Sequence, residues 1–381
     1  MASVVRVPPY GFHAAGRYDD VNFILKNPDL FSSTALITVA RAMGGDRLNK
    51  LLEERGAPAK TGSLVTADPP DHTRLRLLVK QGFSAQAITR LEPRIREIVS
   101  GYIDALLKND EFNFHEELSR EIPSEVIAEL LGIDPERRAE FRRWSNAVVD
   151  SSDILDWSDE AGIEALVSAR VEFYRFLVET VEDRRRNPRN DVISGLVLAK
   201  EEHDALSTDE IIDMVQLLLI AGNETTAYLI SNGVTIWLQR PDVLDELRAN
   251  PRLVHDFVEE TLRFESPIMG VFRATTRELE ISGETLPAGA MVLPMVISAN
   301  RDDSHFGRPD VFDMHRKERQ PVTFGLGPHY CLGAHLARLE ANIAFDELVR
   351  RFPDVSLATD EIDWKHSLFF RGVESLHLRR A

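Results

Sequence analysis

Residues Pro321–Glu340 read PVTFGLGPHYCLGAHLARLE and contain Cys331, the only cysteine in a chain of 381 residues. The thiol lies in a glycine-rich stretch, and glycine permits backbone angles and close approaches that other residues forbid. The glycines are Gly325, Gly327 and Gly333. From Leu332 to Leu348, apolar residues recur every three or four positions, which predicts a helix that begins at or just after Cys331. The free N–H groups at the start of such a helix favour a thiolate.

On the residues alone, four roles are open for this thiol. A lone cysteine is most often a small buried hydrophobic residue. A nucleophile needs a base, and His329 lies two positions away, but such neighbours on an extended loop point in opposite directions. A zinc site needs more ligands than one cysteine and scattered histidines provide. A thiolate on a glycine loop also suits an axial ligand of haem iron, a ligation known from one family of haem proteins.

The composition argues against several classes of protein. A net charge of −17 at pH 7 disfavours nucleic acid as a partner. A single cysteine forms no intramolecular disulfide, which fits a reducing cytoplasm. The first residues, MASVVRVPPYGF, lack the basic and apolar regions of a signal peptide. The most apolar helical segment, MVQLLLIAG, is interrupted by Gln216 and is too short to cross a bilayer, so we expect no membrane anchor.

The order of the elements predicts a single domain over residues 1–381, mainly α with a minor β part (α+β). Helical periodicity dominates from about Thr73 to Phe264. The later segment LEISGETLPAGAMVLPMV is typical of short strands joined by glycine turns. The segment EDRRRNPRND ends a helix with basic residues followed by Pro188. We find no internal repeat, linker or sharp change of composition.

A long helix is predicted from Ser207 to the residue before Pro241. Ser207 and Glu210 have the spacing of a capping box. About 32 helical residues would span roughly 48 Å, and their apolar centre predicts a path through the protein interior. The stretch AGNETT, residues 221–226, interrupts this centre with small and polar residues. Two interpretations stay open: a flat group approaches the backbone beside an acid–alcohol pair, or another helix crosses at the glycine while threonine bonds back to its own helix.

Three motifs, which occur along the chain in the family's order, resemble those of the bacterial soluble cytochrome P450 family. FGLGPHYCLG, residues 324–333, matches the haem-binding signature F-x-x-G-x-x-x-C-x-G, a highly specific pattern. AGNETT matches the oxygen-activation motif A-G-x-[DE]-T-[ST], and ADPPDHTRLR, residues 67–76, resembles the entrance to the family's C-helix. The resemblance implies the cytochrome P450 fold, with haem between the long central helix and the helix after the cysteine.

The family's E-x-x-R motif matches Glu260 and Arg263, but the spacing alone proves little. It recurs at Glu117/Arg120, Glu140/Arg143, Glu172/Arg175 and Glu182/Arg185. Those four are better interpreted as exposed i,i+3 ion pairs. Glu260 and Arg263 are singled out by their own position in the order of motifs. They resemble two members of the family's structural triad, with Arg316 as the third.

The resemblance implies that Cys331 is the proximal ligand of the iron of haem b. Haem propionates need cationic or hydrogen-bonding partners. The family pattern assigns this role to His72, Arg76, Arg273 and His329. Taken singly, such residues are ordinary surface charges, and only their motif positions favour haem. Phe324 and Gly327 belong to the haem signature, and Ala221 and Gly222 would border the oxygen pocket.

On the opposite side of the haem, the resemblance makes Thr225 and Glu224 the catalytic pair, because a hydroxyl can relay a proton that an acid supplies from solvent. Family position also suggests residues of a substrate pocket. These are Leu218, Ile268, Met269, Val271, Phe369 and Phe370. Apolar residues are more often core than ligand contacts, so each of these assignments rests on position alone.

The function implied is a haem-thiolate monooxygenase of secondary metabolism that hydroxylates or epoxidises a small hydrophobic molecule. Two alternatives remain: a peroxygenase or an oxidative-coupling enzyme, and a haem protein that only binds or senses a ligand. The retained Glu224–Thr225 pair disfavours a peroxygenase and a binder, but it does not exclude coupling chemistry. The family does not fix the substrate.

Electrons are expected from NAD(P)H through a separate ferredoxin and ferredoxin reductase, because no reductase domain follows Ala381. The chain is acidic, so docking an acidic ferredoxin needs a local basic patch. The hypothesised patch is Arg74, Lys80, Arg316, Lys317, Arg319 and Arg338. Fewer residues precede Arg17 than is usual in bacterial relatives, so the family's first helix is expected to be short or missing. We expect a cytoplasmic monomer.

Overall fold

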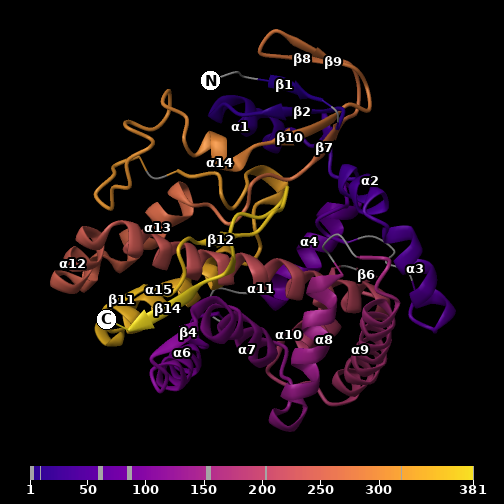
Figure 1. The fold of residues 1–381 in the computed structure, drawn as a ribbon. Helices are drawn as coiled ribbons and strands as arrows, with labels where there is room; N and C mark the ends of the chain where they lie inside the picture. Colours follow the sequence, from indigo (N-terminus) through magenta and orange to yellow (C-terminus); the bar gives the residue numbers. More distant parts are fainter. Residues whose placement is uncertain are drawn as a thin grey trace. The chain divides into compact units, whose positions relative to one another are not determined.

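The computed structural model describes residues 4–8, 10–58, 63–83, 88–151, 156–201, 204–318 and 320–380. Helices predominate, with short strands mainly near the two ends of the described chain (Figure 1). The chain divides into two compact units. Unit 1 comprises Met1–Ser32, Ile88–Pro123 and Thr225–Ala381, and unit 2 comprises Ser33–Ala87 and Ser124–Glu224. The predicted mainly α composition with a minor β part is confirmed.

Unit 1 contains the sheets of the C-terminal half and the helices that pack beside them. Its helices are α1 (Tyr18–Lys26), α6 (Glu92–Leu106), α12 (Pro241–Ala249), α13 (Val254–Phe264), α14 (Val296–Ala299) and α15 (Ala334–Arg351), with a π-helical turn η1 (His115–Ser119) and 3₁₀ turns η3 (Pro251–Leu253) and η4 (Gly327–His329). Helix α15 packs against α6, α12 and α13. The predicted helix after the cysteine is therefore confirmed, and it begins three residues after Cys331.

The largest sheet of unit 1 has the strand order β1-β2-β10-β7-β3. Its strands are β1 (Val4–Val7), β2 (Phe12–Ala15), β10 (Met291–Pro294), β7 (Arg273–Thr275) and β3 (Phe31–Ser32). All pairs are antiparallel except β10 with β2, and Figure 1 shows α1 beside this sheet. The described residues before Tyr18 thus form a strand hairpin, and the first described helix begins there.

The remaining strands of unit 1 form small sheets. These are β4 (Glu111–Asn113), β8 (Leu279–Ile281), β9 (Glu284–Leu286), β11 (Val355–Leu357), β12 (Asp363–Trp364), β13 (Val373–Ser375) and β14 (His377–Arg380), in the orders β11-β14-β4, β12-β13 and β8-β9. The turn between β8 and β9 holds Gly283 at φ 88°, a left-handed conformation that favours glycine. The strands predicted for LEISGETLPAGAMVLPMV are confirmed as β8, β9 and β10.

In the residues of unit 2 that the structure describes, helices predominate and the strands form one short pair. Its elements are α2 (Ala35–Ala42), α3 (Gly45–Glu54), α4 (Asp71–Gly82), η2 (Pro135–Arg137), α8 (Arg138–Asp150), α9 (Glu160–Arg186), α10 (Val192–Leu198), β5 (Lys200–Glu201) and β6 (Asp204–Ala205). Helix α9 ends in three arginines, as predicted from EDRRRNPRND. Helix α7 (Glu121–Leu130) spans the boundary between the two units.

The predicted long helix is α11 (Thr208–Gln239), a helix of 32 residues. Its predicted capping box is confirmed: the Ser207 amide donates to Glu210 Oε2 at 2.7 Å, and the Glu210 amide donates to Ser207 Oγ at 3.2 Å. These two bonds satisfy N–H groups that a helix start would otherwise leave unpaired. The boundary between the units falls inside α11, after Glu224.

In unit 1, the C-terminal part of α11 packs against α13 and α15 around one aromatic ring. The Phe345 ring of α15 lies edge-on to Trp237 of α11 at 5.3 Å and to Phe257 of α13 at 4.9 Å. A Cβ on Gly233 of α11 would lie 2.2 Å from Phe345 Cζ. Glycine at this position therefore lets the ring reach the helix backbone, and the three helices share one core.

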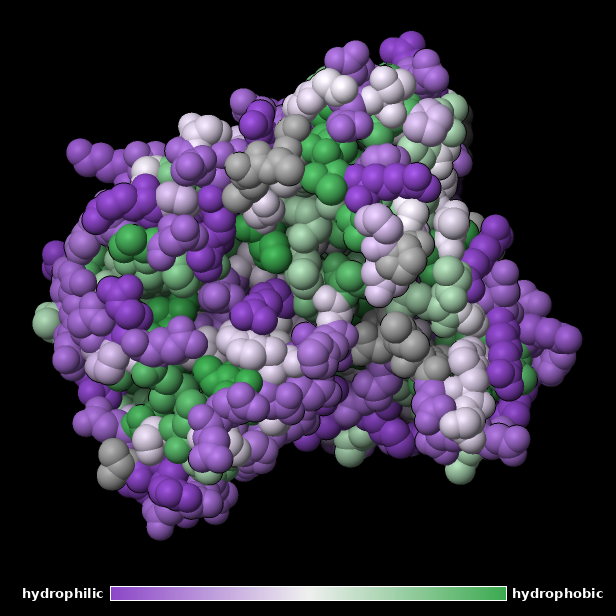
Figure 2. Space-filling model, turned by 45° about the horizontal axis from the view of Figure 1, so that its top comes forward, coloured by the Kyte–Doolittle hydropathy of each residue, from purple (hydrophilic) through white to green (hydrophobic). Residues whose placement is uncertain are grey.

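The face shown in Figure 2 is mostly hydrophilic, with hydrophobic residues visible between the polar ones. This pattern agrees with a chain in which 28% of the residues are charged. Within the described part of the chain, no helix combines the length and apolarity needed to cross a bilayer.

One carboxyl group of unit 1 is buried without compensation. Glu340 of α15 is 2% exposed, and its Oε2 has no hydrogen-bond partner among the described residues. Burial disfavours the charged form and raises the pKa of Glu340 from 4.5 to about 8. The folded protein therefore holds this proton at pH 7, whereas the unfolded chain releases it. Glu340 consequently lowers the free energy of unfolding as the pH rises from 4.5 to about 8.

We expect Glu340→Gln to remove this pH dependence, because the amide has no proton to release. The variant should gain stability over the parent by about 1.4 kcal/mol per pH unit across that window. Denaturant titrations at pH 5 and pH 8 would measure the gain. Glu97→Gln, on the exposed face of α6, is the control and should leave the pH dependence unchanged. A gain of equal size at both pH values would contradict the assignment.

Candidate functional site

The cysteine loop, residues 321–333, is closed by its own backbone. The Cys331 amide donates to the Phe324 carbonyl at 2.8 Å, and the Gly325 amide donates to the Val322 carbonyl at 2.8 Å. Gly325 and Gly327 have φ values of 70° and 69°, which side-chain-bearing residues rarely adopt. The glycines of the sequence pattern are thus required by the turn that carries the cysteine.

The same loop packs tightly against the end of α1. A Cβ on Gly327 would lie 2.7 Å from the Leu25 carbonyl oxygen and 3.1 Å from Lys26 Cα. Backbone cannot yield to such a contact, so a side chain here would push the loop away from α1. Cys331 itself is exposed, and α15 begins after Gly333. The loop therefore presents its thiol outward, close to the positive end of a helix that favours a thiolate.

Arg338 of α15 braces the loop from the helix side. Its guanidinium lies 4.3 Å from the centre of the Phe324 ring, a cation–π contact. Its Nε donates to Glu259 Oε1 of α13 at 2.6 Å, and Nη2 donates to Oε2 at 3.1 Å. This bidentate pair joins α13 to α15, and Phe324 thereby gains a fixed support on the side of the helix.

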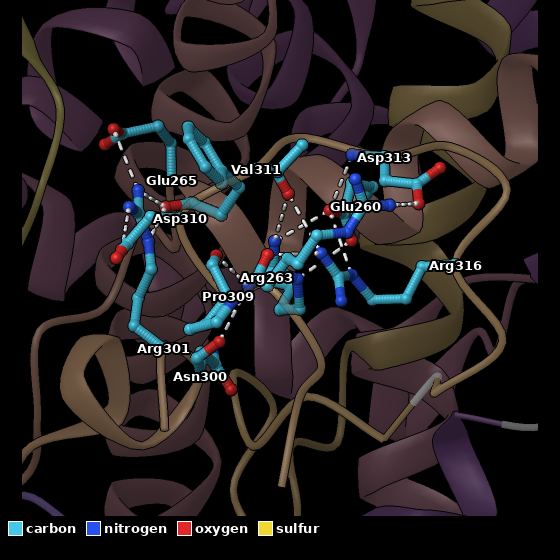
Figure 3. A network of polar contacts seen from close by, with 12 residues as sticks. Glu260, Arg263, Glu265, Asn300, Arg301, Pro309, Asp310, Val311, Asp313 and Arg316 are labelled. Atoms are coloured by element: carbon cyan, nitrogen blue, oxygen red, sulfur yellow. Dashed lines mark hydrogen bonds and ion pairs between the residues drawn. The ribbon is translucent and has the colours of Figure 1, made fainter. Parts of the chain in front are cut away.

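The three residues of the expected triad meet in the interior of unit 1 (Figure 3). Glu260 accepts hydrogen bonds from Arg263 at 2.7 and 2.9 Å and from Arg316 Nε at 3.2 Å. All three residues are at most 6% exposed. The Asp313 amide adds a further donor to Glu260 Oε1 at 2.9 Å. The carboxylate is thus enclosed by donors, as a buried charge requires.

The arginines of this triad use their remaining N–H groups on one loop. Arg263 donates to the carbonyls of Asn300, Pro309 and Val311 at 2.9 to 3.2 Å. Arg316 donates to the carbonyls of Arg308 and Val311 at 3.1 and 2.9 Å. The triad therefore fixes the path of residues 300–316, a stretch that has almost no regular structure of its own.

Asn300 connects this network to the cysteine loop. Its Nδ2 donates to Thr323 Oγ1 at 2.9 Å, and its Oδ1 accepts from the Val322 amide at 2.8 Å. Thr323 Oγ1 in turn donates to the Leu262 carbonyl at 2.6 Å. The start of the cysteine loop is thereby tied to α13. No sequence signal identifies Asn300, because its role depends on backbone groups that only the fold brings near it.

The expected pocket residues of unit 1 form two paired segments, 267–271 and 367–371. The Met269 amide donates to the Phe369 carbonyl at 2.8 Å, and the Arg371 amide donates to the Pro267 carbonyl at 2.9 Å. The Phe369 ring lies edge-on to Phe272 at 5.9 Å. Arg273, at the start of β7, is 4% exposed and donates to the Phe272 carbonyl at 2.9 Å. The two segments therefore form a single wall next to Arg273.

In unit 2, the expected haem residues lie on α4 and α11. His72 and Arg76 are one turn apart on the same face of α4, and His72 is 1% exposed. On α11, a Cβ on Gly222 would lie 2.8 Å from Ile127 Cδ1 of α7. The Ile127 side chain therefore contacts α11 at this glycine, as a crossing helix would. Leu218 and Glu224 are partly buried, whereas Ala221 is exposed.

Thr225 is the first residue of unit 1 after the boundary within α11, so the residues expected around one cofactor belong partly to each unit. His329, in turn η4 of the cysteine loop, is partly buried. Among the described residues, no group of three or more His, Cys, Asp or Glu side chains is placed to hold a metal ion.

Sequence reasoning missed a buried polar cluster in unit 2. Arg170 of α9 is 8% exposed and donates to Ser151 Oγ at 2.6 Å and to Gln216 Oε1 of α11 at 2.7 Å. Burial lowers the pKa of Arg170 to about 10, against the opposing charge of Asp213. Gln216, visible in the sequence only as an interruption of an apolar run, is therefore the partner of a buried arginine.

Some predicted surface features are wrong. Arg316 belongs to the buried triad and cannot contribute to a basic patch, because its guanidinium is enclosed by carbonyls and Glu260. Arg74 is salt-bridged to Asp204 and Glu210, and Arg338 to Glu259. Lys80 and Lys317 are exposed, and Arg319 lies outside the described residues.

Two of the exposed i,i+3 pairs also have other partners in the fold. Arg120 bonds Glu116 one turn earlier, and Arg143 of α8 reaches Glu172 of α9. Spacing within a helix did not reveal these partners, because the side chain reaches whichever carboxylate the turn geometry or the next helix brings closer.

The donor set fits haem on the cysteine side. A single outward thiol on a rigid glycine loop offers one axial ligand, and a buried guanidinium at Arg273 offers the cationic partner that a propionate needs. The family model for Cytochrome P450 matches residues 21–365 of this chain. The chain belongs to the cytochrome P450 family. Membership implies haem and a hydrophobic substrate.

Relatives that align with nearly the whole chain support the assignment to this family. Cytochrome P450 107B1 of Saccharopolyspora erythraea is 39% identical over 369 residues, which cover 95% of this chain and 88% of that protein. Vitamin D(3) 25-hydroxylase of Pseudonocardia autotrophica is 37% identical over 382 residues, covering 97% and 93%. The solved structure of cytochrome P450 CYP109Q5 from Chondromyces apiculatus is 38% identical with a TM-score of 0.88, covering 100% and 92%. The cytochrome P450 fold predicted from the motifs is confirmed, and the protein is a haem monooxygenase.

Removing the central arginine of the triad should destabilise this P450 strongly. Arg263→Ala leaves Glu260 buried with a reduced set of donors and removes the Arg263 donor from the Asn300 and Pro309 carbonyls, while Val311 keeps its bond from Arg316. We expect a loss of at least about 3 kcal/mol in the free energy of unfolding, and Arg263→Lys should rescue little because an ammonium lacks the planar fork. Denaturant titration measures both losses.

The matched control is Arg94→Ala, which breaks an exposed i,i+3 pair with Glu97 on α6 and should cost little. A loss for Arg263→Ala no larger than that of the control would show that the buried triad does not hold the fold.

Proposed function

We propose that this cytochrome P450 inserts one oxygen atom of O2 into a small hydrophobic molecule, by hydroxylation or epoxidation. For a hydroxylation, the substrate, O2, two electrons and two protons give the alcohol and one water. The observation that carries the proposal is the rigid cysteine loop with its outward thiol, closed by the bond from the Cys331 amide to Phe324 and packed on α1. A non-catalytic binder would need the thiol but not the acid–alcohol pair on α11.

In this proposal Cys331 binds haem b through its iron, and the propionates have the partners that the family pattern assigns, namely Arg273, His329, His72 and Arg76. Bound haem supplies the activation of O2. Arg273 supports this role because it places a buried cationic side chain beside the wall at Phe272. Ala221 and Gly222 of α11 keep side-chain bulk away from the oxygen pocket.

Thr225 and Glu224 deliver the protons. The Thr225 hydroxyl accepts a proton from the solvent side and passes one on without holding a charge, and Glu224 replenishes it. Both residues lie on α11, a continuous helix with a satisfied N-terminal cap, so their spacing is fixed by helix geometry.

The substrate wall of unit 1 consists of Ile268, Met269, Val271, Phe369 and Phe370, and Leu218 adds an apolar residue from unit 2. A small apolar molecule suits such a wall, because aliphatic and aromatic side chains offer it no charge or donor. The name of one relative, a vitamin D(3) 25-hydroxylase, is consistent with hydroxylation of an apolar molecule.

Electrons come from NAD(P)H through a ferredoxin reductase and a ferredoxin. Of the cations expected to receive an acidic ferredoxin, Lys80 and Lys317 are exposed and form no salt bridge with the described residues, so we assign the docking role to them. The protein acts as a cytoplasmic monomer in this proposal.

Thr225→Ala should uncouple turnover. With a surrogate ferredoxin and its reductase, we expect NAD(P)H consumption to continue while product per NAD(P)H falls about tenfold and hydrogen peroxide rises, because the proton relay is broken. The red-shifted Soret band of the reduced carbonyl complex first confirms thiolate ligation in each preparation. Thr235→Ala, ten positions later in α11, is the control and should stay coupled. Unchanged coupling in Thr225→Ala would refute the role of this hydroxyl.

Charge reversal at Lys80 or Lys317 should slow reduction by the ferredoxin. We expect a loss of about threefold in each case at low ionic strength that shrinks at high ionic strength, because screening removes the attraction that the lysine supplied. Stopped-flow reduction at two salt concentrations measures it. Lys50→Glu, an exposed position on α3, serves as the control. Equal rates for all variants and the parent would exclude both lysines from docking.

A further inference from the structure

Asn232 is a fully buried polar residue in the apolar C-terminal part of α11, and no motif includes it. Its Nδ2 donates two hydrogen bonds, to the Glu265 carbonyl at 3.0 Å and to the Arg371 carbonyl at 2.9 Å. The two acceptors are 106 positions apart in the chain and lie beside the two segments of the pocket wall. One amide group therefore joins both segments to one point on α11.

The wall that these bonds hold is itself a paired unit. Met269 and Arg371 donate backbone hydrogen bonds across it, to Phe369 and Pro267 respectively. Ile268 and Phe370 form an isolated antiparallel bridge. The two segments are therefore coupled. A shift of either carbonyl that Asn232 binds would move both Ile268 and Phe370.

Close contacts on both sides leave this wall little freedom. A Cβ on Gly372 would lie 2.0 Å from Cδ1 of Tyr228, one turn before Asn232 on α11. A Cβ on Gly270 would lie 2.5 Å from the Pro294 carbonyl of β10. The wall thus packs closely between α11 and β10. The two hydrogen bonds from Asn232 fix the position of the wall along α11.

The chemistry of the position requires an amide and not its acid. Both groups that face Nδ2 are carbonyl oxygens, which accept and cannot donate. Oδ1 is buried and accepts no hydrogen bond among the described residues. The two bonds that Nδ2 donates therefore fix the orientation of the side chain alone. Aspartate, with the same shape, would place an oxygen against two carbonyl oxygens.

We propose that Asn232 is a positioning residue that sets the distance between the substrate wall and the proton-relay hydroxyl. Asn232 follows Thr225 by seven positions on the same helix, so the two lie on one face, about 10 Å apart along the axis. Asn232 thereby fixes the position of the wall relative to Thr225. This position determines how far an apolar group of the substrate extends towards the reacting centre. The proposal rests on the proposed function, which makes residues 268–271 and 369–370 the wall.

The test compares two probes that bind the haem iron of the holoenzyme through a nitrogen. Imidazole is too small to lean on the wall, whereas 4-phenylimidazole places an apolar ring against it. In Asn232→Asp and Asn232→Ala we expect the dissociation constant of 4-phenylimidazole to rise about tenfold, the effect of losing two neutral hydrogen bonds, and that of imidazole to change less than about twofold. Optical difference titrations measure both constants.

Thr235→Ala is the matched control, because this buried hydroxyl donates only to the Asn232 carbonyl within α11 and touches neither segment. It should leave the binding of both probes unchanged. If both probes weaken equally in the Asn232 variants, or neither weakens, the positioning role is overturned.

Hydrogen exchange gives a readout that does not depend on haem chemistry. Amides of residues 268–271 and 367–372 should lose protection in Asn232→Ala while the exchange of α15 stays unchanged. Parent-like exchange of all three segments would overturn the proposal. If the parent itself bound neither probe, the proposed function would fail, and the exchange experiment would still decide whether Asn232 holds the wall. Asn232→Ala keeps the test available should the aspartate variant not fold.

Discussion

The buried carboxylate of Glu260, enclosed by two guanidinium groups, is the interaction on which the rest of unit 1 depends. Two arginines and one carboxylate without solvent are costly to bury, so the arrangement persists only because every donor has an acceptor. Those acceptors are carbonyls of residues 300–311, a loop with no sheet or helix to order it. Asn300 then hydrogen-bonds to Val322 and Thr323, and these bonds fix the start of the cysteine loop. A charge network without chemistry of its own thus fixes the start of the loop that carries Cys331.

What the sequence could predict was local. The capping box at Ser207 and Glu210, the strands around Gly283 and the helix after Cys331 each depend on neighbours within a few positions, and each is confirmed. Partners across the fold were not accessible in this way. Arg143 pairs with Glu172 on another helix, and Arg170 is buried against Gln216, and neither pair has a signal in the sequence. A charged residue reveals its need for a partner, but the partner is chosen by tertiary packing.

The candidate site shows the same division. Gly325 and Gly327 could be recognised because a left-handed turn and a contact of 2.7 Å with Leu25 leave no alternative to glycine. Asn232, Asn300 and Arg170 could not, because each holds groups that come from distant parts of the chain: two carbonyls, the start of a loop, or a glutamine on another helix. In the sequence each appears only as a polar residue without a visible partner, a pattern that also fits an ordinary surface position.

The contrast between the cysteine loop and the substrate wall explains why the family can be identified from the sequence and the substrate cannot. The loop is specified by glycine conformations and by backbone contacts that tolerate no side chain, so its sequence can hardly vary while it still presents a thiol. The wall is held by backbone-to-backbone bonds, such as that from Met269 to Phe369, and by Asn232, whose partners are carbonyls. Such bonds are indifferent to the side chains they position. In the proposed function, the same scaffold can therefore carry different apolar residues at 268, 269, 271, 369 and 370, and the side-chain volumes there select the substrate, whereas Gly270 is fixed by its contact with the Pro294 carbonyl.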